Sequence, residues 1–312
     1  MALAPRTRKK YIAAGTEFLE FRKIMQLDHT WPAPVEHLLQ FSVALHNKGL
    51  APSTIQGKLA AVGFYAKANG FRDFSGDFRI RKMLEGWARE KGKVEDDRTP
   101  ISPVILERLG ELWGVVCGDG YEKVLFHAAA LVAFFGAMRI SELVALGKGD
   151  VSRNALQFDD VMVQGEQVVV RIRSSKADQT GRGCHLRMGR CSRESICPVK
   201  AVKEFISFRG TGQGYFFQHA DKSPLTKYQF WRLTDMALER LGVKHMRFGT
   251  HSFRIGAAST AAALGYSVEQ IKQIGHWSSK CYHKYVRQIP NTQVGADFVL
   301  QVDGGKKSGG TS

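Results

Sequence analysis

The sequence predicts a mainly helical protein with a small antiparallel β-sheet, an α+β fold divided into two domains. Three observations lead to this prediction. Apolar residues recur at helical spacing through most of the chain. Two β-branched stretches bounded by turn residues occur near its middle, and a polar, proline-ended stretch at 92–101 has the composition of a linker. With 312 residues, 44% of them hydrophobic, the chain is long enough for about two buried cores.

Residues 1–95 are predicted to form a bundle of helices. Apolar periodicity indicates four of them, at 9–25, 35–46, 54–69 and about 77–91. We expect Ser53 or Thr54 to cap the third helix, and Gly70 to end it. After this domain we place a linker at 96–101, a second domain at 102–300, and a disordered tail of Gly, Ser and Lys at 301–312.

The second domain is predicted to begin with two helices, at 101–113 and 122–138. The latter is apolar on most of its faces, which is typical of a core helix, and Arg139 would lie at its C-terminal end. The stretches 160–175 and 183–189 predict a small antiparallel sheet with Lys176 in the turn between its strands. Helices return at Pro198, a residue that suits the first turn of a helix.

The charge of the chain indicates a polyanionic partner. The net charge is +16 and the isoelectric point is about 9.7. Residues 1–95 hold 16 Lys and Arg against 9 Asp and Glu, or +7, which leaves 29 against 20, or +9, for residues 96–312. Nucleic acid is the commonest polyanion, and two basic domains would suit a clamp that grips DNA from both sides.

Other classes of protein fit less well. No run of roughly 18 apolar residues predicts a membrane span, and no apolar stretch after the basic N-terminus predicts a secretory signal. We therefore expect an intracellular protein without disulfides. A zinc site could be imagined from Cys184, Cys191, Cys197 and His185, but the tight C-x-x-C spacing is missing. No metal and no cofactor is predicted.

The residues that suggest chemistry are concentrated at 251–287. Ser267 and Gln270 form a capping-box pattern for a helix that ends at Gly275. His276 and Trp277 would follow on a turn, and a short helix starting at Ser278 or Ser279 would place Tyr282 and Tyr285 on one face. A tyrosine hydroxyl has an ordinary pKa of about 10, so attack on phosphate near neutral pH requires a base and a dense positive field.

These residues carry a resemblance to a known family. The pattern H-x-x-R at His251 and Arg254, then Gly275-His276, then Tyr285 nine residues later, resembles the tyrosine recombinase (phage integrase) family. An earlier R-x-S-E-L match supplies Arg139 and Glu142. The stretch 50–70 is similar to the helical core-binding domain that precedes the catalytic domain in that family. The wording HSFRIGAA and GHWSS is most similar to recombinases of eukaryotic DIRS-type retroelements and their relatives.

The resemblance assigns roles to individual side chains. Arg139 and Arg254 would grip nonbridging phosphate oxygens, His276 would add a hydrogen bond, and Glu142 would support the site. His251 would accept the proton of the nucleophile, which by its spacing from His276 is Tyr285 rather than Tyr282. The family's catalytic lysine comes from a hairpin, so Lys176 would protonate the leaving 5′-oxygen, with Arg182 as the alternative.

The function implied is that of a site-specific DNA recombinase or integrase that cleaves and rejoins DNA through a 3′-phosphotyrosine, independently of metal ions. Its partner would be double-stranded DNA, bound as a homotetramer on two sites, with a monomer or dimer off DNA. The segment 291–302 would dock on a neighbouring subunit or pack within its own. The alternatives are a type IB topoisomerase-like enzyme and a domesticated, inactive DNA-binding protein. The location would be nuclear for a eukaryotic mobile element, and otherwise cytoplasmic or at the nucleoid.

Overall fold

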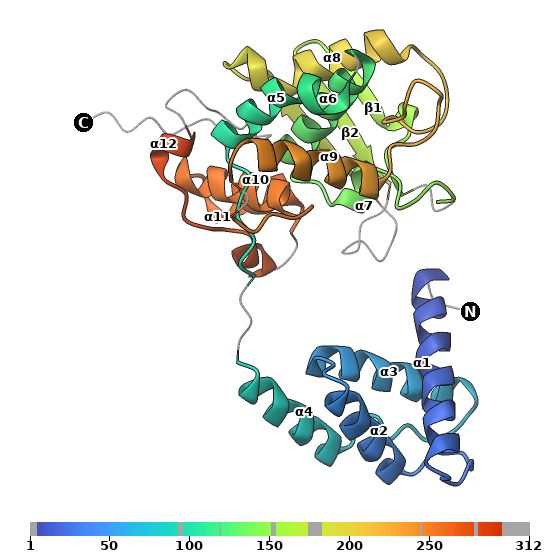
Figure 1. Cartoon of the computed structure of the whole chain (residues 1–312). Coiled ribbons are helices and arrows are strands. Elements are labelled where there is room, and N and C mark those ends of the chain that lie inside the picture. Colours follow the sequence, from blue (N-terminus) through green and yellow to red (C-terminus); the bar gives the residue numbers. More distant parts are fainter. Residues whose placement is uncertain are drawn as a thin grey trace. The chain divides into compact units, whose positions relative to one another are not determined.

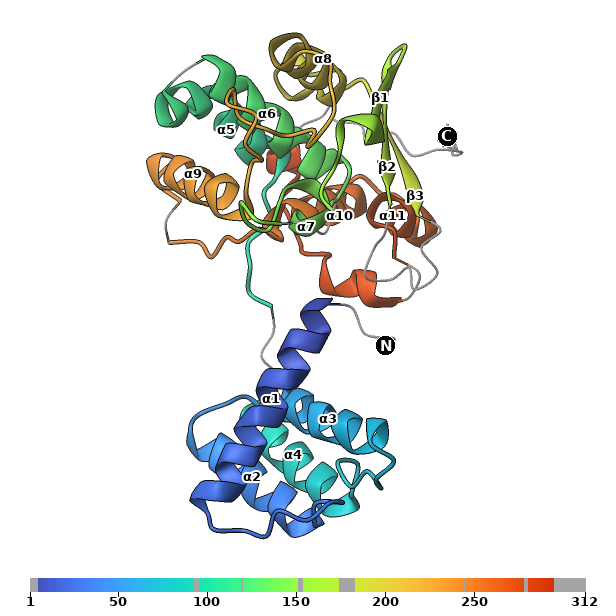
Figure 2. The ribbon, with the colours of Figure 1, turned by 90° about the vertical axis from the view of Figure 1, so that its right-hand side faces the viewer.

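The computed structural model describes residues 5–92, 96–118, 120–150, 154–173, 183–243, 245–277 and 280–294 (Figures 1 and 2). The chain divides into two compact units, Met1–Glu95 and Asp96–Ser312. Both units are mainly helical, and the second also holds a small antiparallel sheet. The predicted α+β class is confirmed.

The first unit contains the four predicted helices. They are α1 (Pro5–Ile24), α2 (Val35–Asn47), α3 (Pro52–Ala68) and α4 (Phe78–Glu90). The predicted cap of α3 was wrong. The helix begins earlier, with Ala51 as its N-cap and Pro52 in its first turn, so Ser53 and Thr54 are already helical. Proline favours this position because its fixed φ suits a helix and its missing N–H would have had no partner there.

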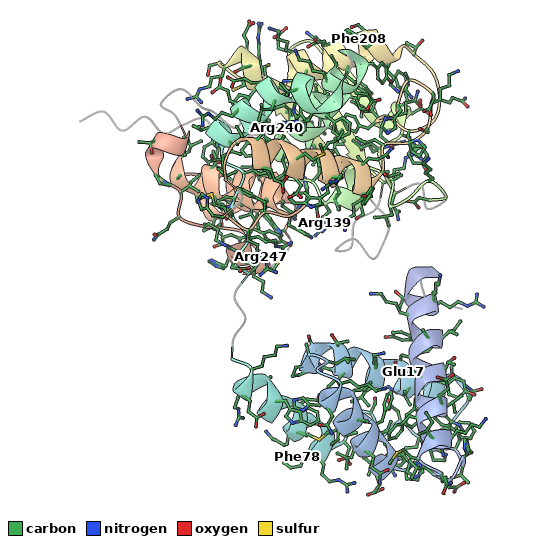
Figure 3. All side chains as sticks on the ribbon, viewed as in Figure 1. Glu17, Phe78, Arg139, Phe208, Arg240 and Arg247 are labelled. Atoms are coloured by element: carbon green, nitrogen blue, oxygen red, sulfur yellow. The ribbon has the colours of Figure 1, made fainter. Side chains whose placement is uncertain are left out.

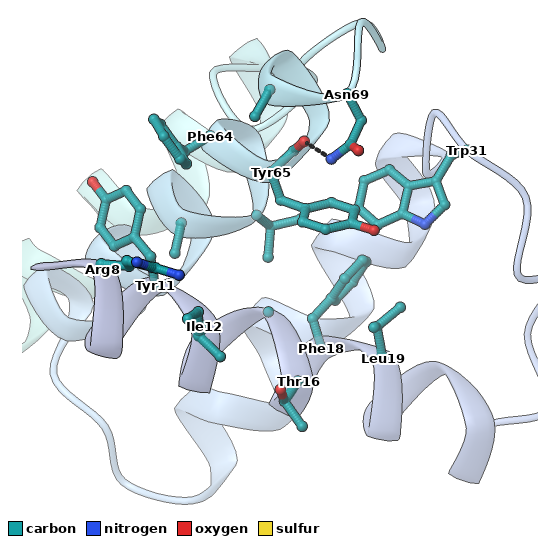
Figure 4. Close-up of a pocket in the computed structure, with 14 residues that line it drawn as sticks. Arg8, Tyr11, Ile12, Thr16, Phe18, Leu19, Trp31, Phe64, Tyr65 and Asn69 are labelled. Atoms are coloured by element: carbon teal, nitrogen blue, oxygen red, sulfur yellow. Dashed lines mark hydrogen bonds between the residues drawn. The ribbon is translucent and has the colours of Figure 1, made fainter. Parts of the chain in front are cut away.

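The core of the first unit is aromatic and contains one buried guanidinium. Arg22 of α1 is fully buried, faces the rings of Phe18 and Trp31, and donates hydrogen bonds to the carbonyl oxygens of Asp28 and Thr30. Beside this core, α1 and α3 border a cavity of about 420 Å³ (Figure 4). Its aromatic lining includes Trp31 and Tyr65, whose ring centroids lie 4.9 Å apart.

The second unit is built around a buried helix, as predicted from its apolar faces. Helix α6 (Gly120–Phe135) packs against α5 (Pro103–Cys117), α8 (Pro198–Arg209) and α10 (Ser252–Ala263). The remaining α-helices are α7 (Ile140–Leu143), α9 (Lys227–Arg240), α11 (Val268–Gly275) and α12 (Asn291–Val294). Among the described residues they are accompanied by the 3₁₀ helices η1 (Phe158–Asp160), η2 (Glu194–Ile196) and η3 (Lys280–Lys284).

The sheet has three antiparallel strands in the order β1 (Val161–Gln164), β2 (Gln167–Ile172) and β3 (Cys184–Gly189). Val170 of β2 is aligned with Val161 on one side and Leu186 on the other, and all three side chains are buried. Helix α8 packs against all three strands, at one side of the unit in Figure 2. Lys176 and Arg182 belong to the segment between β2 and β3 and lie outside the described residues.

The segment expected to be a linker, 96–101, is hydrogen-bonded to the second unit. The backbone N–H of Thr99 donates to the carbonyl of Arg247 at 2.6 Å, and that of Ile101 donates to Ser252 at 3.0 Å. The side chain of Ile101 is fully buried, and its carbonyl lies where a Cβ on Gly256 of α10 would stand. This segment is therefore attached to the second unit, and Ile101 belongs to its core.

Two further findings concern the classes considered from the sequence. In the described ranges, no helix is both long and apolar enough to cross a membrane. Nor do three or more His, Cys, Asp or Glu side chains gather there as a metal site would require. Of the cysteines considered for zinc, Cys191 and Cys197 pack in the core.

Candidate active site

The site is centred on Arg254, whose guanidinium is fully buried on α10. Nη1 donates to the carbonyl of Ala137 and Nη2 to the carbonyl of Gly275. These acceptors lie at the C-terminal ends of α6 and α11, where unpaired carbonyls carry the negative end of the helix dipole. Burial and the nearby Arg139 lower the pKa of Arg254 to about 10, so it stays charged at neutral pH. The arginine thus joins two helix ends and brings a fixed positive charge between them.

The acceptor on α6 is positioned by a Schellman motif. The N–H of Ala137 donates to Phe134 at 2.9 Å and the N–H of Met138 to Ala133 at 3.0 Å, as this motif requires. Ala137 itself is left-handed, with φ of 40°. We had predicted that Arg139 would lie at the C-terminal end of α6. Because the helix breaks at Ala137, Arg139 is instead the N-cap of the separate helix α7.

A second Schellman motif, at the end of α11, places His276 and Trp277. Here the N–H of Trp277 donates to Lys272 at 3.0 Å, and His276 takes the left-handed position with φ of 50°. The capping box of Ser267 and Gln270 opens α11 as predicted, with the Gln270 N–H donating to the Ser267 hydroxyl at 3.2 Å. Because both ends of this short helix are fixed, the orientation of the residues that follow it is fixed as well.

Arg139 and Glu142 form a closely coupled pair. One carboxylate oxygen of Glu142 accepts from Nη1 of Arg139 at 2.8 Å, and the other accepts from the Arg139 backbone N–H at 2.9 Å. Glu142 is buried, whereas the side chain of Arg139 keeps 19% exposure. Figure 3 shows Arg139 on the side of the unit where Arg247 lies, away from Phe208. Glu142 therefore holds a partly exposed arginine in one orientation.

Two histidines lie within the field of these arginines. His251 is the half-buried N-cap of α10, and its pKa is lowered to about 4 by burial first, then by Arg98 and Arg254. Burial, with Arg254 and Arg139, also lowers the pKa of His276 to about 4. Both imidazoles are therefore neutral at pH 7 in the protein alone.

Some polar atoms of this region are buried without a hydrogen-bond partner among the described residues. They are Nε of Arg254, Nε2 of His276 and Nε1 of Trp277. A buried donor left unpaired costs about 1–3 kcal/mol, more if it is charged. Groups of this kind at one site indicate a ligand that accepts hydrogen bonds and carries negative charge.

The two tyrosines differ in their surroundings. Tyr285 is half-buried, and its ring lies 5.0 Å from Trp277, 5.1 Å from the guanidinium carbon of Arg254 and 6.4 Å from the His251 ring. Tyr282 is buried and packs against His283, with Lys272 above its ring. The expected short helix is the 3₁₀ helix η3, which ends at Lys284, so Tyr285 follows it on a turn. We had predicted that the two tyrosines would lie on one face of this helix, but only Tyr282 belongs to it.

Of the predicted site residues, the structure brings together Arg139, Glu142, His251, Arg254, His276 and Tyr285. Lys176 lies outside the described residues. The sequence reasoning missed Arg98, which lowers the pKa of His251 and whose own pKa is raised in part by Tyr285. Arg98 stands in a stretch of linker composition, and nothing in that composition indicates that it lies near the candidate active site.

No protein-family model matches the chain, but comparisons with known proteins find relatives in sequence. An integrase/recombinase XerD homolog of Selenomonas ruminantium is 25% identical over 301 residues, covering 91% of this chain and 82% of the relative. The recombinase Cre of Escherichia phage P1 is 23% identical over 304 residues, covering 88% and 81%.

Solved structures share the fold at low sequence identity. The XerH site-specific recombinase bound to difH substrate, in a pre-cleavage complex, has a TM-score of 0.60 and 10% identity, covering 90% of this chain and 75% of that one. A λ integrase dimer bound to a COC′ core site has a TM-score of 0.58 and 14% identity, covering 91% and 72%. The Tn1549 transposon integrase with circular intermediate DNA has a TM-score of 0.55 and 16% identity, covering 93% and 92%. The chain is thus similar in sequence to two recombinases, and it shares its fold with solved structures of recombinases and integrases bound to DNA.

Proposed function

We propose that this protein is a site-specific DNA recombinase that cleaves and rejoins DNA through a 3′-phosphotyrosine formed by Tyr285. The observation that carries the proposal is the buried guanidinium of Arg254, with Nε unpaired and the Tyr285 ring 5.1 Å away. A phosphodiester in this place would pair the free donor and set the reacting phosphorus beside a phenol.

The electrostatics suit phosphoryl transfer. In the transition state, negative charge builds on the nonbridging oxygens while the nucleophile enters and the 5′-oxygen leaves. Arg139 and Arg254 bring guanidinium groups that are charged at neutral pH, and Nε2 of His276 has no hydrogen-bond partner among the described residues. Fixed donors of this kind stabilise the charge without reorganising during the reaction.

His251 is the proposed proton acceptor. Its lowered pKa of about 4 makes it neutral at pH 7, so a ring nitrogen is free to take a proton. A base with so low a pKa is weak, but arrival of the phosphate would oppose the field of the arginines and raise the pKa toward neutrality. We therefore expect His251 to become an effective base when DNA is bound.

The proposed step balances in protons and electrons. Tyr285 Oη forms a bond to phosphorus as its proton passes to His251, and the bond from phosphorus to the 5′-oxygen breaks. The leaving oxygen takes a proton, which we assign to Lys176 because of the family resemblance. The phosphotyrosine keeps the energy of the broken bond, so a 5′-hydroxyl from another strand can reverse the step without ATP.

Double-stranded DNA is the proposed partner, with a homotetramer on two DNA sites as the active assembly. The charge of +7 on residues 1–95 and +9 on the remainder supports DNA contacts by both units. Recombination is preferred to topoisomerase action because the relatives described above are recombinases and integrases. Val294 of α12 is buried in its own unit, against α5 and α10, so docking on a neighbour would fall to residues beyond it.

We also propose a mobile-element origin in a eukaryote, with action in the nucleus. The motif wording HSFRIGAA and GHWSS, similar to that of DIRS-type recombinases, supports this part of the proposal. Sequencing the flanks of the gene tests it, because an element should carry repeats at its ends, whereas single-copy flanks without repeats would contradict it.

The deciding experiment is covalent trapping. The full chain is incubated, in EDTA, with a library of nicked duplexes from which the short cleaved strand diffuses away. We expect a protein–DNA adduct at the 3′ side of the break and, with two sites on one plasmid, strand exchange. Relaxation without exchange would assign the topoisomerase alternative, and the absence of any adduct from the library would overturn the proposal.

A further inference from the structure

A third arginine approaches the candidate active site from the segment that begins the second unit. Arg98 is held by Asp96, whose Oδ1 accepts from Nε at 2.7 Å and whose Oδ2 accepts from Nη2 at 2.6 Å. These bonds lower the pKa of Asp96 to about 2 and raise that of Arg98, so both groups are charged at neutral pH. Nη1 of Arg98 takes no part in the pair.

Arg98 lies within the electrostatic range of the residues of the proposed reaction. After burial, it is the largest influence on the pKa of His251, ahead of Arg254, and its charge also interacts with Tyr285. Its Cδ lies 3.2 Å from the place of a Cβ on Gly249, two residues before His251. The arginine thus crosses the turn that leads into α10, beside the proposed base.

Asp96 is also tied to the segment that carries Tyr285. Its carbonyl accepts from Nη2 of Arg287 at 2.8 Å, and Nη1 of Arg287 donates to the carbonyls of Lys284 and Val286 on either side of Tyr285. The position of Arg98 and the position of the Tyr285 turn therefore depend on the same aspartate.

A purely structural role does not account for this arrangement. The Asp96–Arg98 pair keeps about a third of each side chain exposed, and ion pairs of this kind contribute little to stability. The pair instead holds a third guanidinium whose charge, together with those of Arg254 and Arg139, acts on His251. An anion brought beside His251 would be attracted by these same charges.

We propose that Arg98 is a further DNA-contacting residue of this site, which binds a backbone phosphate next to the cleaved one, and that Asp96 is its positioning residue. The inference rests on the proposed function and deepens it, because it makes the segment at 96–98 part of the DNA-binding surface. Nη1 supplies the donor for the phosphate, and the fork held by Asp96 keeps it in place.

The test uses the full chain with Arg98→Gln, Arg98→Lys and Asp96→Asn. The matched control is Arg190→Gln, an exposed arginine paired with Glu166 and Glu194. Circular dichroism and thermal melting establish that each variant is folded. Three quantities are then measured: the single-turnover rate of adduct formation, the slope of log K for DNA against log salt, and the titration of His251 by NMR without DNA.

We expect Arg98→Gln to slow adduct formation by about 10- to 100-fold and to flatten the salt slope by about 0.9, one phosphate contact. It should also let His251 titrate at higher pH, since Asp96, Arg139, Arg254 and the Tyr285 ring would remain around it without the cation that lowers its pKa most. Arg98→Lys should keep the salt slope and the His251 titration. Asp96→Asn should slow adduct formation with the salt slope unchanged.

A wild-type rate, slope and His251 titration in Arg98→Gln would overturn the inference and leave the proposed function intact. If the wild-type chain forms no adduct at all, the proposed function fails. The salt slope and the His251 titration would then still test the DNA contact of Arg98. If Arg98→Gln left both unchanged, that inference would fail as well.

Discussion

The guanidinium carbon of Arg254 lies 4.4 Å from the centroid of the Trp277 ring, whose atoms fill the space that a Cβ on residue 275 would need. Trp277 stacks in turn near Tyr285, at 5.0 Å between centroids. A cation over an indole face is stabilised by about 0.5–2 kcal/mol. The tryptophan therefore supports the arginine and the proposed nucleophile together, and Gly275 makes room for it.

Gly275→Ala should damage both stability and cleavage. The new methyl group would stand 2.0 Å from the Trp277 ring, and the whole indole would have to move to relieve the clash. Overpacking of this kind costs about 1–3 kcal/mol, and the displaced ring would disturb Arg254. Chemical denaturation and adduct formation measure the two effects. Gly57→Ala is the matched control: nothing lies within 4 Å of that Cβ in α3, so stability should rise slightly. Equal behaviour of both variants would refute the packing argument.

Tyr285→Phe should abolish covalent attachment and leave DNA binding nearly unchanged, because one hydroxyl is lost and no charge. Tyr282→Phe should keep attachment, since that side chain is buried against His283. Denaturing gels of trapped complexes, with binding measured alongside, give the comparison. If only the Tyr282 variant loses the adduct, the nucleophile has been misassigned.

Arg139→Ala should reduce the cleavage rate by about 10²-fold or more, the usual effect of removing one donor to a developing oxyanion. It is a cleaner test than a change at Arg254, which also joins the ends of α6 and α11. Arg190→Ala serves as the exposed control. Single-turnover rates at saturating protein separate the chemical step from binding, and a wild-type rate for Arg139→Ala would exclude it from the site.

Stability should fall as the pH is lowered from about 6.5 to about 4. The pKa values of His127, His251 and His276 are each lowered from 6.5 to about 4, with burial as the largest cause. In this window the unfolded chain takes up protons at these sites and the folded chain does not, so the free energy of unfolding decreases on acidification. Above about pH 6.5 these histidines are neutral in both the folded and the unfolded chain, so they do not change the free energy of unfolding with pH.

Thermal melting between pH 7.5 and pH 4.5 measures this effect. His276→Gln should make the dependence shallower, whereas the matched change at the exposed His245 should not. A melting temperature that stays constant through the window would show that the imidazoles are not held neutral.

The features of the fold and of the candidate site that could be predicted from the sequence are those that a short local pattern of residues determines. The capping box at Ser267 and the apolar faces of α6 are local patterns, and both were predicted. The cap of α3 was misplaced because Pro52 competes with Ser53 and Thr54 for the start of the helix. Arg139 was assigned to the end of α6 because nothing in the letters marks Ala137 as left-handed.

The residues that sequence reasoning missed act through tertiary contacts. Asp96 and Arg98 stand in a polar stretch that has the composition of a linker, yet they pack beside Arg287, nearly two hundred residues away. Only the fold brings these segments together. The spacing of His276 and Tyr285, by contrast, was informative because a single short stretch of chain sets both positions.

Ala137 has a consequence for any attempt to make this protein more heat-stable. A left-handed alanine costs about 1–2 kcal/mol, so glycine is the obvious replacement at this helix end. Glycine would, however, forfeit a buried methyl worth about 0.8 kcal/mol and gain freedom in the unfolded chain worth about 0.4–1 kcal/mol. These contributions nearly cancel, while the carbonyl that holds Arg254 would become looser. Such a variant would pass a screen for folding unnoticed and be found only by a screen for DNA cleavage.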